Sequence, residues 1–145
     1  MQLTKYTDFG LRVMMYLTQG SGRDTPITIH EIAERFDVSR NHLVKVVHFL
    51  AQQGWVATSR GKGGGLRLAH APAEYPLGDL VYALENQQSL VNCGEPLCAL
   101  KGMCLLSGVL ADGLKAFYDE LNRHTLADLV AAPTGEAIIR LQWAA

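Results

Sequence analysis

The sequence has no long apolar run and no sign of a secretion signal. Its apolar stretches fall far short of the roughly 20 residues that a bilayer-spanning helix needs. The opening stretch, MQLTKYTDFGLRVMMYL, lacks the basic-then-apolar order and the small-residue cleavage site of a secretory signal. Internal repeats, nucleotide-binding motifs and acid–base pairs are also missing. We therefore expect a cytoplasmic protein that makes no membrane contact and is not an enzyme.

Acidic residues are absent from one segment of the chain. Residues 38–70 hold five basic residues and no Asp or Glu, whereas nine acids and four bases follow from residue 71 onward. The five are Arg40, Lys45, Arg60, Lys62 and Arg67. An acid-free basic segment in a chain of net charge −1 indicates an anionic partner, and a merely solvated basic face is the alternative.

The apolar spacing predicts several helices in a mainly α fold. The 145 residues are 48% hydrophobic, enough for one domain with a core. Helical spacing covers residues 7–18 and 27–36, with a loop at 20–26 between them. Ser39 is placed as the N-cap of a third helix that Gly54 ends. Its predicted buried stripe is Leu43, Val46, Val47 and Leu50.

Two helices joined by a short turn are typical of the helix-turn-helix, whose second helix enters the DNA major groove. Donors for base edges or phosphates occupy the outward positions near the start of that second helix. They are Ser39, Arg40, Asn41, His42 and Lys45.

A glycine-rich hairpin follows. Residues 55–57 and 66–68 read as short strands, and SRGKGGG lies between them. Glycines such as Gly63 and Gly64 let a backbone approach another surface closely. Arg60, Lys62 and Arg67 can then reach phosphates or a minor groove, as a β-wing does. A nucleotide-binding loop would need P-loop spacing, which is absent, and a hairpin without function is the other alternative.

Two more helices are expected after the wing. The first covers residues 76–85. After Cys104 a 3–4 spacing continues for about twenty residues, or roughly 30 Å of helix, with inward positions at Leu106, Val109 or Leu110, Leu114, Phe117 and Leu121. Such a helix is too long for a small domain to cover, so we expect it to pack on a second subunit related by a two-fold axis. Packing on the wing domain of its own chain is the alternative.

These elements predict a winged helix-turn-helix DNA-binding domain over residues 1–85. A cysteine-rich loop over 86–105 and a dimerisation helix with a C-terminal segment over 106–145 complete the expected chain.

All three cysteines lie in the segment LVNCGEPLCALKGMCLL. The three cysteines could be core residues, a thiol switch or metal ligands. Gly94, Pro96 and Gly102 would let the loop turn tightly enough for all three thiols to converge, which favours metal ligands. Thiolates select zinc or iron–sulfur clusters. The gaps of four and five residues between the cysteines suit an iron–sulfur cluster, which is larger, better than a zinc ion. A fourth ligand is then needed. The candidates are Glu95, His30, His124 and Asp8, although a carboxylate such as Asp8 is also common at a helix N-terminus as a cap.

The combination resembles the family of iron–sulfur winged-helix repressors. The resemblance covers nearly the whole chain and is carried by LTKYTDFGLR, VSRNHLVKVV, RGKGGGLRL, LVNCGEPLCALKGMC and HTLADLV. It implies a homodimer that binds inverted-repeat operators in double-stranded DNA and holds one iron–sulfur cluster per subunit, either 2Fe-2S or 4Fe-4S.

The cysteine spacing is similar to the nitric-oxide-sensing branch of that family. The branch that regulates cluster biogenesis has gaps of five and five, and a histidine ligand where this chain has Ser107. The resemblance implies that Cys93, Cys98 and Cys104 bind the cluster and that Asp8 of the partner subunit completes it. Nitric oxide would then be the effector that releases the DNA. A related regulator that senses iron–sulfur or redox status, or that uses zinc or a thiol switch, is the alternative.

Overall fold

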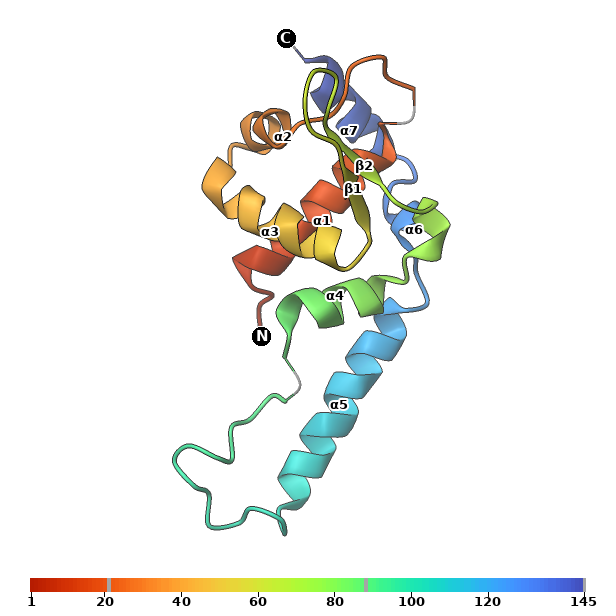
Figure 1. Ribbon diagram of the computed structural model, residues 1–145. Coiled ribbons are helices and arrows are strands. Elements are labelled where there is room, and N and C mark those ends of the chain that lie inside the picture. The colour runs from red at the N-terminus through yellow and green to blue at the C-terminus, as the bar shows by residue number, and fades with distance from the viewer. Residues whose placement is uncertain (21, 88, 145) are drawn as a thin grey trace.

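The computed structural model describes residues 1–20, 22–87 and 89–144 and is mainly helical (Figure 1). Ser21, Gln88 and Ala145 belong to the predicted loop 20–26 and to the segments 86–105 and 106–145, and they lie outside the described residues. The elements are α1 (Lys5–Thr18), α2 (Ile29–Phe36), α3 (Arg40–Gln52), β1 (Val56–Thr58), β2 (Leu66–Leu68), η1 (Pro72–Glu74), α4 (Leu77–Glu85), α5 (Leu105–Leu121), α6 (Leu126–Leu129) and α7 (Thr134–Trp143).

Helices α2 and α3 form the predicted helix-turn-helix. The Thr28 hydroxyl accepts the Glu31 N–H at 3.1 Å and starts α2. Asp37 ends it in the left-handed region at φ 51°, a conformation that Asp tolerates better than most residues. Helix α3 begins after Ser39 and ends at Gln52, just before Gly54, and its predicted stripe of Leu43, Val46, Val47 and Leu50 is buried.

The two strands form the predicted β-wing. They pair antiparallel, with Val56 opposite Leu68 and Thr58 opposite Leu66. The Leu66 N–H also donates to the Ile27 carbonyl at 2.8 Å, which ties the wing to the segment before α2. The mainly α, winged helix-turn-helix fold is therefore confirmed.

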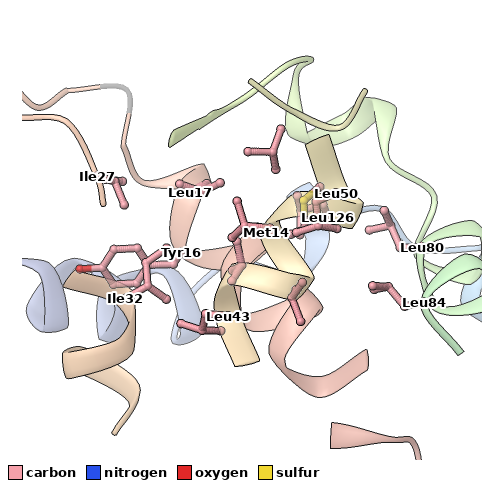
Figure 2. Close-up of a cluster of buried hydrophobic side chains, with 14 of the residues drawn as sticks. Met14, Tyr16, Leu17, Ile27, Ile32, Leu43, Leu50, Leu80, Leu84 and Leu126 are labelled. Atoms are coloured by element: carbon pink, nitrogen blue, oxygen red, sulfur yellow. The ribbon is translucent and has the colours of Figure 1, made fainter. Parts of the chain in front are cut away.

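The core lies between α1, α3, α4 and the C-terminal segment (Figure 2). Met14, Leu50 and Leu80 meet there with Leu126, which is fully buried. Ile138 of α7 joins the same core, and the Gln142 side chain donates to the Tyr16 carbonyl at 3.0 Å. The chain after α5 thus returns to the helix-turn-helix body, a contact that apolar spacing alone did not predict.

Helix α5 ends at Leu121 and has 17 residues, fewer than the roughly twenty that the apolar spacing suggested. The next residue, Asn122, accepts the Asp79 N–H at 3.0 Å and donates to the Asp79 carboxylate at 2.9 Å. A Cβ at Gly78 would collide with the Tyr118 carbonyl, so glycine is what permits α4 to cross α5 closely. This crossing fixes the end of α5 and directs its other end away from the body.

Residues 89–104 and α5 together form an arm that extends beyond α4 (Figure 1). The side chain of Leu114 is the one in α5 that is buried, where α5 contacts α4. Among the described residues, no helix combines the length and apolarity that a bilayer crossing needs.

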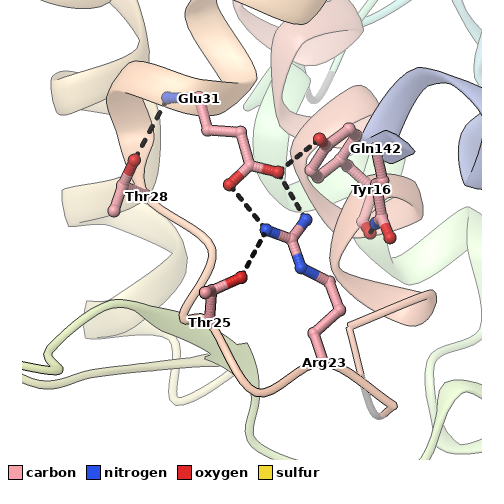
Figure 3. A network of polar contacts seen from close by, with 6 residues as sticks. All are labelled: Tyr16, Arg23, Thr25, Thr28, Glu31 and Gln142. Carbon is pink, nitrogen blue, oxygen red and sulfur yellow. Dashed lines mark hydrogen bonds and ion pairs between the residues drawn. The ribbon is translucent and has the colours of Figure 1, made fainter. Parts of the chain in front are cut away.

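A polar network anchors α2 to α1 (Figure 3). The Arg23 guanidinium bonds to the Glu31 carboxylate at 2.5 and 3.1 Å, and the Tyr16 hydroxyl donates to the same carboxylate at 2.6 Å. Burial raises the pKa of Glu31, but hydrogen bonds from Arg23 and Tyr16 outweigh it and hold that pKa below its ordinary value. Burial, with the Glu31 contact, raises the pKa of Tyr16 to about 12.

We predict that Glu31→Gln lowers the free energy of unfolding by about 1 to 3 kcal/mol at pH 7, because Arg23 loses the charge of its partner. Since the folded pKa of Glu31 is depressed, its contribution is complete above the unfolded pKa of about 4.3 and is lost as pH falls through the folded value. The difference between the two proteins should therefore vanish at low pH. Urea denaturation at fixed protein concentration measures it.

Glu34→Gln is the matched control, since this exposed carboxylate on the same helix forms a weak ion pair with the exposed His30, at 3.4 Å. It should change stability by less than about 0.5 kcal/mol. Equal losses in the two variants would contradict a special role for the Arg23–Glu31–Tyr16 network.

Candidate nucleic-acid interface and metal centre

The start of α3 presents the predicted base-reading residues to solvent. Ser39, Arg40, Asn41, His42 and Lys45 are all exposed, on the side opposite the buried stripe of that helix. Ser39 occupies the N-cap position, yet its side chain makes no capping hydrogen bond. The core thus holds α3 by its inner face and leaves a polar outer face available for an external partner.

One of these residues also contacts α1. The His42 ring stacks on the Phe9 ring, with centroids 6.2 Å apart and planes at 25°. Phe9 directly follows Asp8, so the first turns of α1 and α3 are in contact beside the predicted base-reading surface.

The wing presents its cations on a tightly turned backbone. Arg60, Lys62 and Arg67 are exposed. Gly63 has φ +83°, and a Cβ at Gly64 would collide with the Ser59 carbonyl, so both positions require glycine for the turn. The Ser59 hydroxyl accepts the Gly65 N–H at 3.1 Å and closes the loop.

The basic residues of segment 38–70 are not neutralised internally. The ion pairs found among the described residues join Arg12 to Asp8, Arg23 to Glu31, His30 to Glu34, Lys115 to Asp119 and Arg123 to Glu120. None of the five basic residues between 38 and 70 takes part in them. Their charge is therefore free to attract an anionic partner.

A residue that the predicted DNA surface did not include lies beside it. His30, weighed from the sequence only as a metal ligand, lines a groove together with Arg40 and Arg60. Its position at the start of α2, next to the wing, depends on tertiary packing, so spacing along the chain could not reveal it.

The three cysteines lie on the arm and are free thiols. Cys93, Cys98 and Cys104 are each half-buried. The Cys98 N–H donates to the Cys93 carbonyl at 3.2 Å, and Asn92 accepts the Gly94 N–H at 2.9 Å. Cys104 stands at the N-cap of α5, where the Ser107 hydroxyl donates to its carbonyl at 2.8 Å.

The structure does not bring these thiols together into a metal site. In the part of the chain that it describes, no three His, Cys, Asp or Glu side chains are grouped so that they could hold a metal ion. Asp8, Glu95, His30 and His124 therefore complete no such group with the cysteines within one subunit. Apolar side chains of the cysteine loop are exposed to solvent, with Leu97 at 73% and Met103 at 81%.

Asp8 does not cap α1. The Thr4 hydroxyl does so by accepting the Thr7 N–H at 3.2 Å, whereas Asp8 lies in the first turn, where its charge still suits the helix dipole. The Asp8 carboxylate instead pairs with Arg12 through both oxygens, at 2.9 Å each. Arg12 also lies over the Phe36 ring of α2, 5.7 Å from its centroid.

The start of α1 is tied to the point where the cysteine loop begins. Glu85, the last residue of α4, accepts the Thr4 N–H at 2.6 Å and the Thr4 hydroxyl at 3.0 Å. Burial raises the pKa of Glu85, but the hydrogen bonds from Thr7 and Thr4 outweigh it and keep that pKa below its ordinary value. The segment that holds Asp8 and the segment that holds the cysteines thus share one anchor.

An apolar face of α5 is uncovered. Leu106, Val109, Gly113 and Ala116 recur at helical spacing on the side away from α4, and all four are exposed. Leu106 is 61% exposed and Val109 is 66% exposed. Met103 and Leu105, just before and at the start of the same helix, are exposed as well, at 81% and 86%.

Several solved structures share this fold over nearly their whole length. CymR, the global cysteine regulator of B. subtilis, is 25% identical with a TM-score of 0.71, and the match covers 89% of this chain and 95% of that chain. IscR of T. potens is 25% identical with a TM-score of 0.68, covering 90% and 86%. The oxidised form of Staphylococcus aureus CymR is 26% identical with a TM-score of 0.68, covering 89% and 95%.

The Rrf2 sequence family, described as iron-dependent transcriptional regulators, matches residues 3–132. That range includes the helix-turn-helix, the wing, the cysteine loop and α5. The chain therefore belongs to the Rrf2 family of iron-dependent transcriptional regulators.

Proposed function

We propose that this chain is a homodimeric iron–sulfur repressor of the NsrR type, which releases operator DNA in response to nitric oxide. The observation that carries the proposal is the set of three free thiols on an exposed arm, with gaps of four and five residues and Ser107 after them. Ser107 replaces the imidazole of the biogenesis branch, and its hydroxyl is bound to the Cys104 carbonyl.

The donor set fits an iron–sulfur cluster chemically. Three thiols in one loop are soft ligands that select such clusters or zinc. Within the described residues, the hydrogen bonds of segment 89–104 stay inside the segment, except those that its end residues Ser89 and Cys104 accept from Gln87 and Ser107. The loop can therefore close its thiolates around a cluster without breaking contacts to the body. When bound, a 2Fe-2S or 4Fe-4S cluster, one per subunit, supplies iron with which nitric oxide reacts.

The uncovered face of α5 supports the homodimer. An apolar stripe at spacing i, i+3, i+7 and i+10 on an exposed helix is the pattern by which helices pack on each other. A second copy related by a two-fold axis would cover it and would bring the two arms together. Two-fold symmetry of the protein in turn implies an inverted-repeat operator.

Asp8 would connect the cluster to the DNA surface. Asp8 of the partner subunit completes the coordination in this proposal, and it gives up the ion pair with Arg12 to do so. Because Phe9 follows Asp8 and stacks on His42, a change of partner at Asp8 alters the support of α3. A coupling of a few kcal/mol between the two sites releases most of the bound DNA.

A regulator that uses zinc or a thiol switch is the second candidate. The bond from the Cys98 N–H to the Cys93 carbonyl closes a turn that brings these two backbones together, as a reversible disulfide would need. The similarity to an oxidised form of CymR points in the same direction. Metal analysis and a visible spectrum of anaerobically purified protein separate the two candidates.

We predict that nitric oxide weakens operator binding by about 5- to 150-fold as the cluster absorbance bleaches. The measurement is an anaerobic titration with fluorescence anisotropy on a duplex selected by the protein from a random library. Cys98→Ala is the control, since it should bind little iron and should not respond to nitric oxide. An affinity that stays constant through complete bleaching would remove the sensing claim.

We predict that Asp8→Ala lowers the affinity for the cluster by about 10- to 100-fold, because one coordination position loses its protein ligand. The half-life of the cluster absorbance in the presence of a chelator measures this. Arg12→Gln breaks the same Asp8–Arg12 ion pair but keeps the carboxylate, so it should leave the half-life unchanged or longer. Equal shortening in both variants would assign Asp8 a structural role only.

We predict that Val109→Glu raises the dimer dissociation constant by more than about 100-fold, because an unpaired carboxylate would have to be buried in the helix interface. Sedimentation velocity over a concentration series measures it. Lys115→Glu places the same side chain on another side of α5, where it loses only an exposed ion pair to Asp119. A Val109→Glu protein that remains dimeric would show that this face is not the interface.

A further inference from the structure

A groove of about 330 Å³ opens where α2, α3 and the wing meet. Its rim carries one basic side chain from each of the three elements, namely His30, Arg40 and Arg60. The exposed, hydroxyl-bearing Thr58 and Ser59 at the end of β1 also line the groove. Two arginines and a histidine thus line the groove, together with the apolar side chains of Ile29, Val47 and Leu66.

In the part of the chain that the structure describes, the two arginines of the groove, Arg40 and Arg60, have no ion-pair partner. His30 contacts the Glu34 carboxylate through Nε2 at 3.4 Å, and both side chains are about two-thirds exposed, at 69% and 65%. So loose a contact leaves the imidazole free to donate an N–H to another acceptor.

The proposed mode of DNA binding determines what would occupy the groove. If α3 lies in a major groove and the wing reaches the adjacent minor groove, one sugar–phosphate strand has to run between them, because that strand separates the two grooves of the duplex. The space between α3 and the wing is the groove that Arg40 and Arg60 line. The chemistry of its rim matches the phosphate group of that strand.

We propose that this groove binds a single backbone phosphate of the DNA, with His30 as the ligand contributed by α2. The inference rests on the proposed DNA binding and extends it to a residue outside the recognition helix and the wing. A phosphate contact positions the protein on any duplex and carries no sequence information. His30 therefore sets the affinity for DNA in general, whereas Asn41 on α3 serves base recognition.

The first test compares His30→Ala with the unchanged full-length protein, purified anaerobically, on two duplexes of equal length and composition. One duplex is selected by the protein from a random library, and the other has the same bases in scrambled order. His30→Ala should raise the Kd for both duplexes by about three- to tenfold and leave their ratio unchanged. His30→Lys should restore the affinity and steepen its dependence on salt by about 0.9 in log–log slope.

His124→Ala is the matched control, because this exposed histidine lies after α5, away from the groove. It should change neither Kd. An unaltered Kd in His30→Ala would overturn the proposal, and so would a loss confined to the selected duplex, since that would mean base reading. If the unchanged protein does not prefer the selected duplex, the operator-binding proposal fails, while equal weakening of both duplexes by His30→Ala would still support the phosphate site.

A second test locates the phosphate. Single phosphates of the selected duplex are replaced in turn by neutral methylphosphonate. At one position in each half-site, replacement should weaken the unchanged protein and have no further effect on His30→Ala, because both changes remove the same contact. Additive losses at every position would overturn the assignment of His30.

Discussion

Helix α1 packs on α3, α4, β2 and α6 at once, so that Val13, Met14 and Tyr16 are excluded from solvent. The remainder of the molecule depends on this burial. The first turn of α1 is held by Glu85 of α4, and its last turns are held by Gln142 of α7 through the Tyr16 carbonyl. Because every other element of the body touches α1 directly or through one neighbour, a small shift of this helix cannot be absorbed locally in a close-packed core.

The body and the arm differ in how far they bury their apolar side chains. In the body, apolar side chains from α1, α3, α4 and α6 cover each other and leave the polar face of α3 outside. The arm buries little beyond Leu114 and leaves Met103, Leu105 and Val109 exposed together with the half-buried thiols. A segment that exposes this much apolar surface is stable in water only when something covers it. The proposed second subunit would cover the exposed face of α5, and the proposed cluster would occupy the thiols of the loop.

The sequence was most informative where structure is local. The stripe of Leu43, Val46, Val47 and Leu50 predicted both the existence and the buried face of α3, since helical periodicity is encoded in neighbouring residues. The wing followed from its glycines in the same way. The break at Asn122 and the return of α7 to Tyr16 were not predictable, because each depends on a partner more than forty residues away in the chain, at Asp79 and Tyr16 respectively. The place of His30 beside the wing also depends on packing between distant segments, whereas the Thr4 cap of α1 is a local bond to Thr7 that we did not predict from the sequence.

The hydrogen bond from Gln142 to the Tyr16 carbonyl has a consequence for biosynthesis. It joins residues 126 positions apart, and Leu126 and Ile138 complete the same core from the C-terminal side. Long-range contacts of this kind form late, after the intervening chain has been made. A ribosome that has released only the first 85 residues has therefore produced all of the helix-turn-helix and the wing without the groups that close their core. The face of α3 that carries the predicted DNA contacts therefore gains its full support from the core only after the thiol-bearing arm has been synthesised.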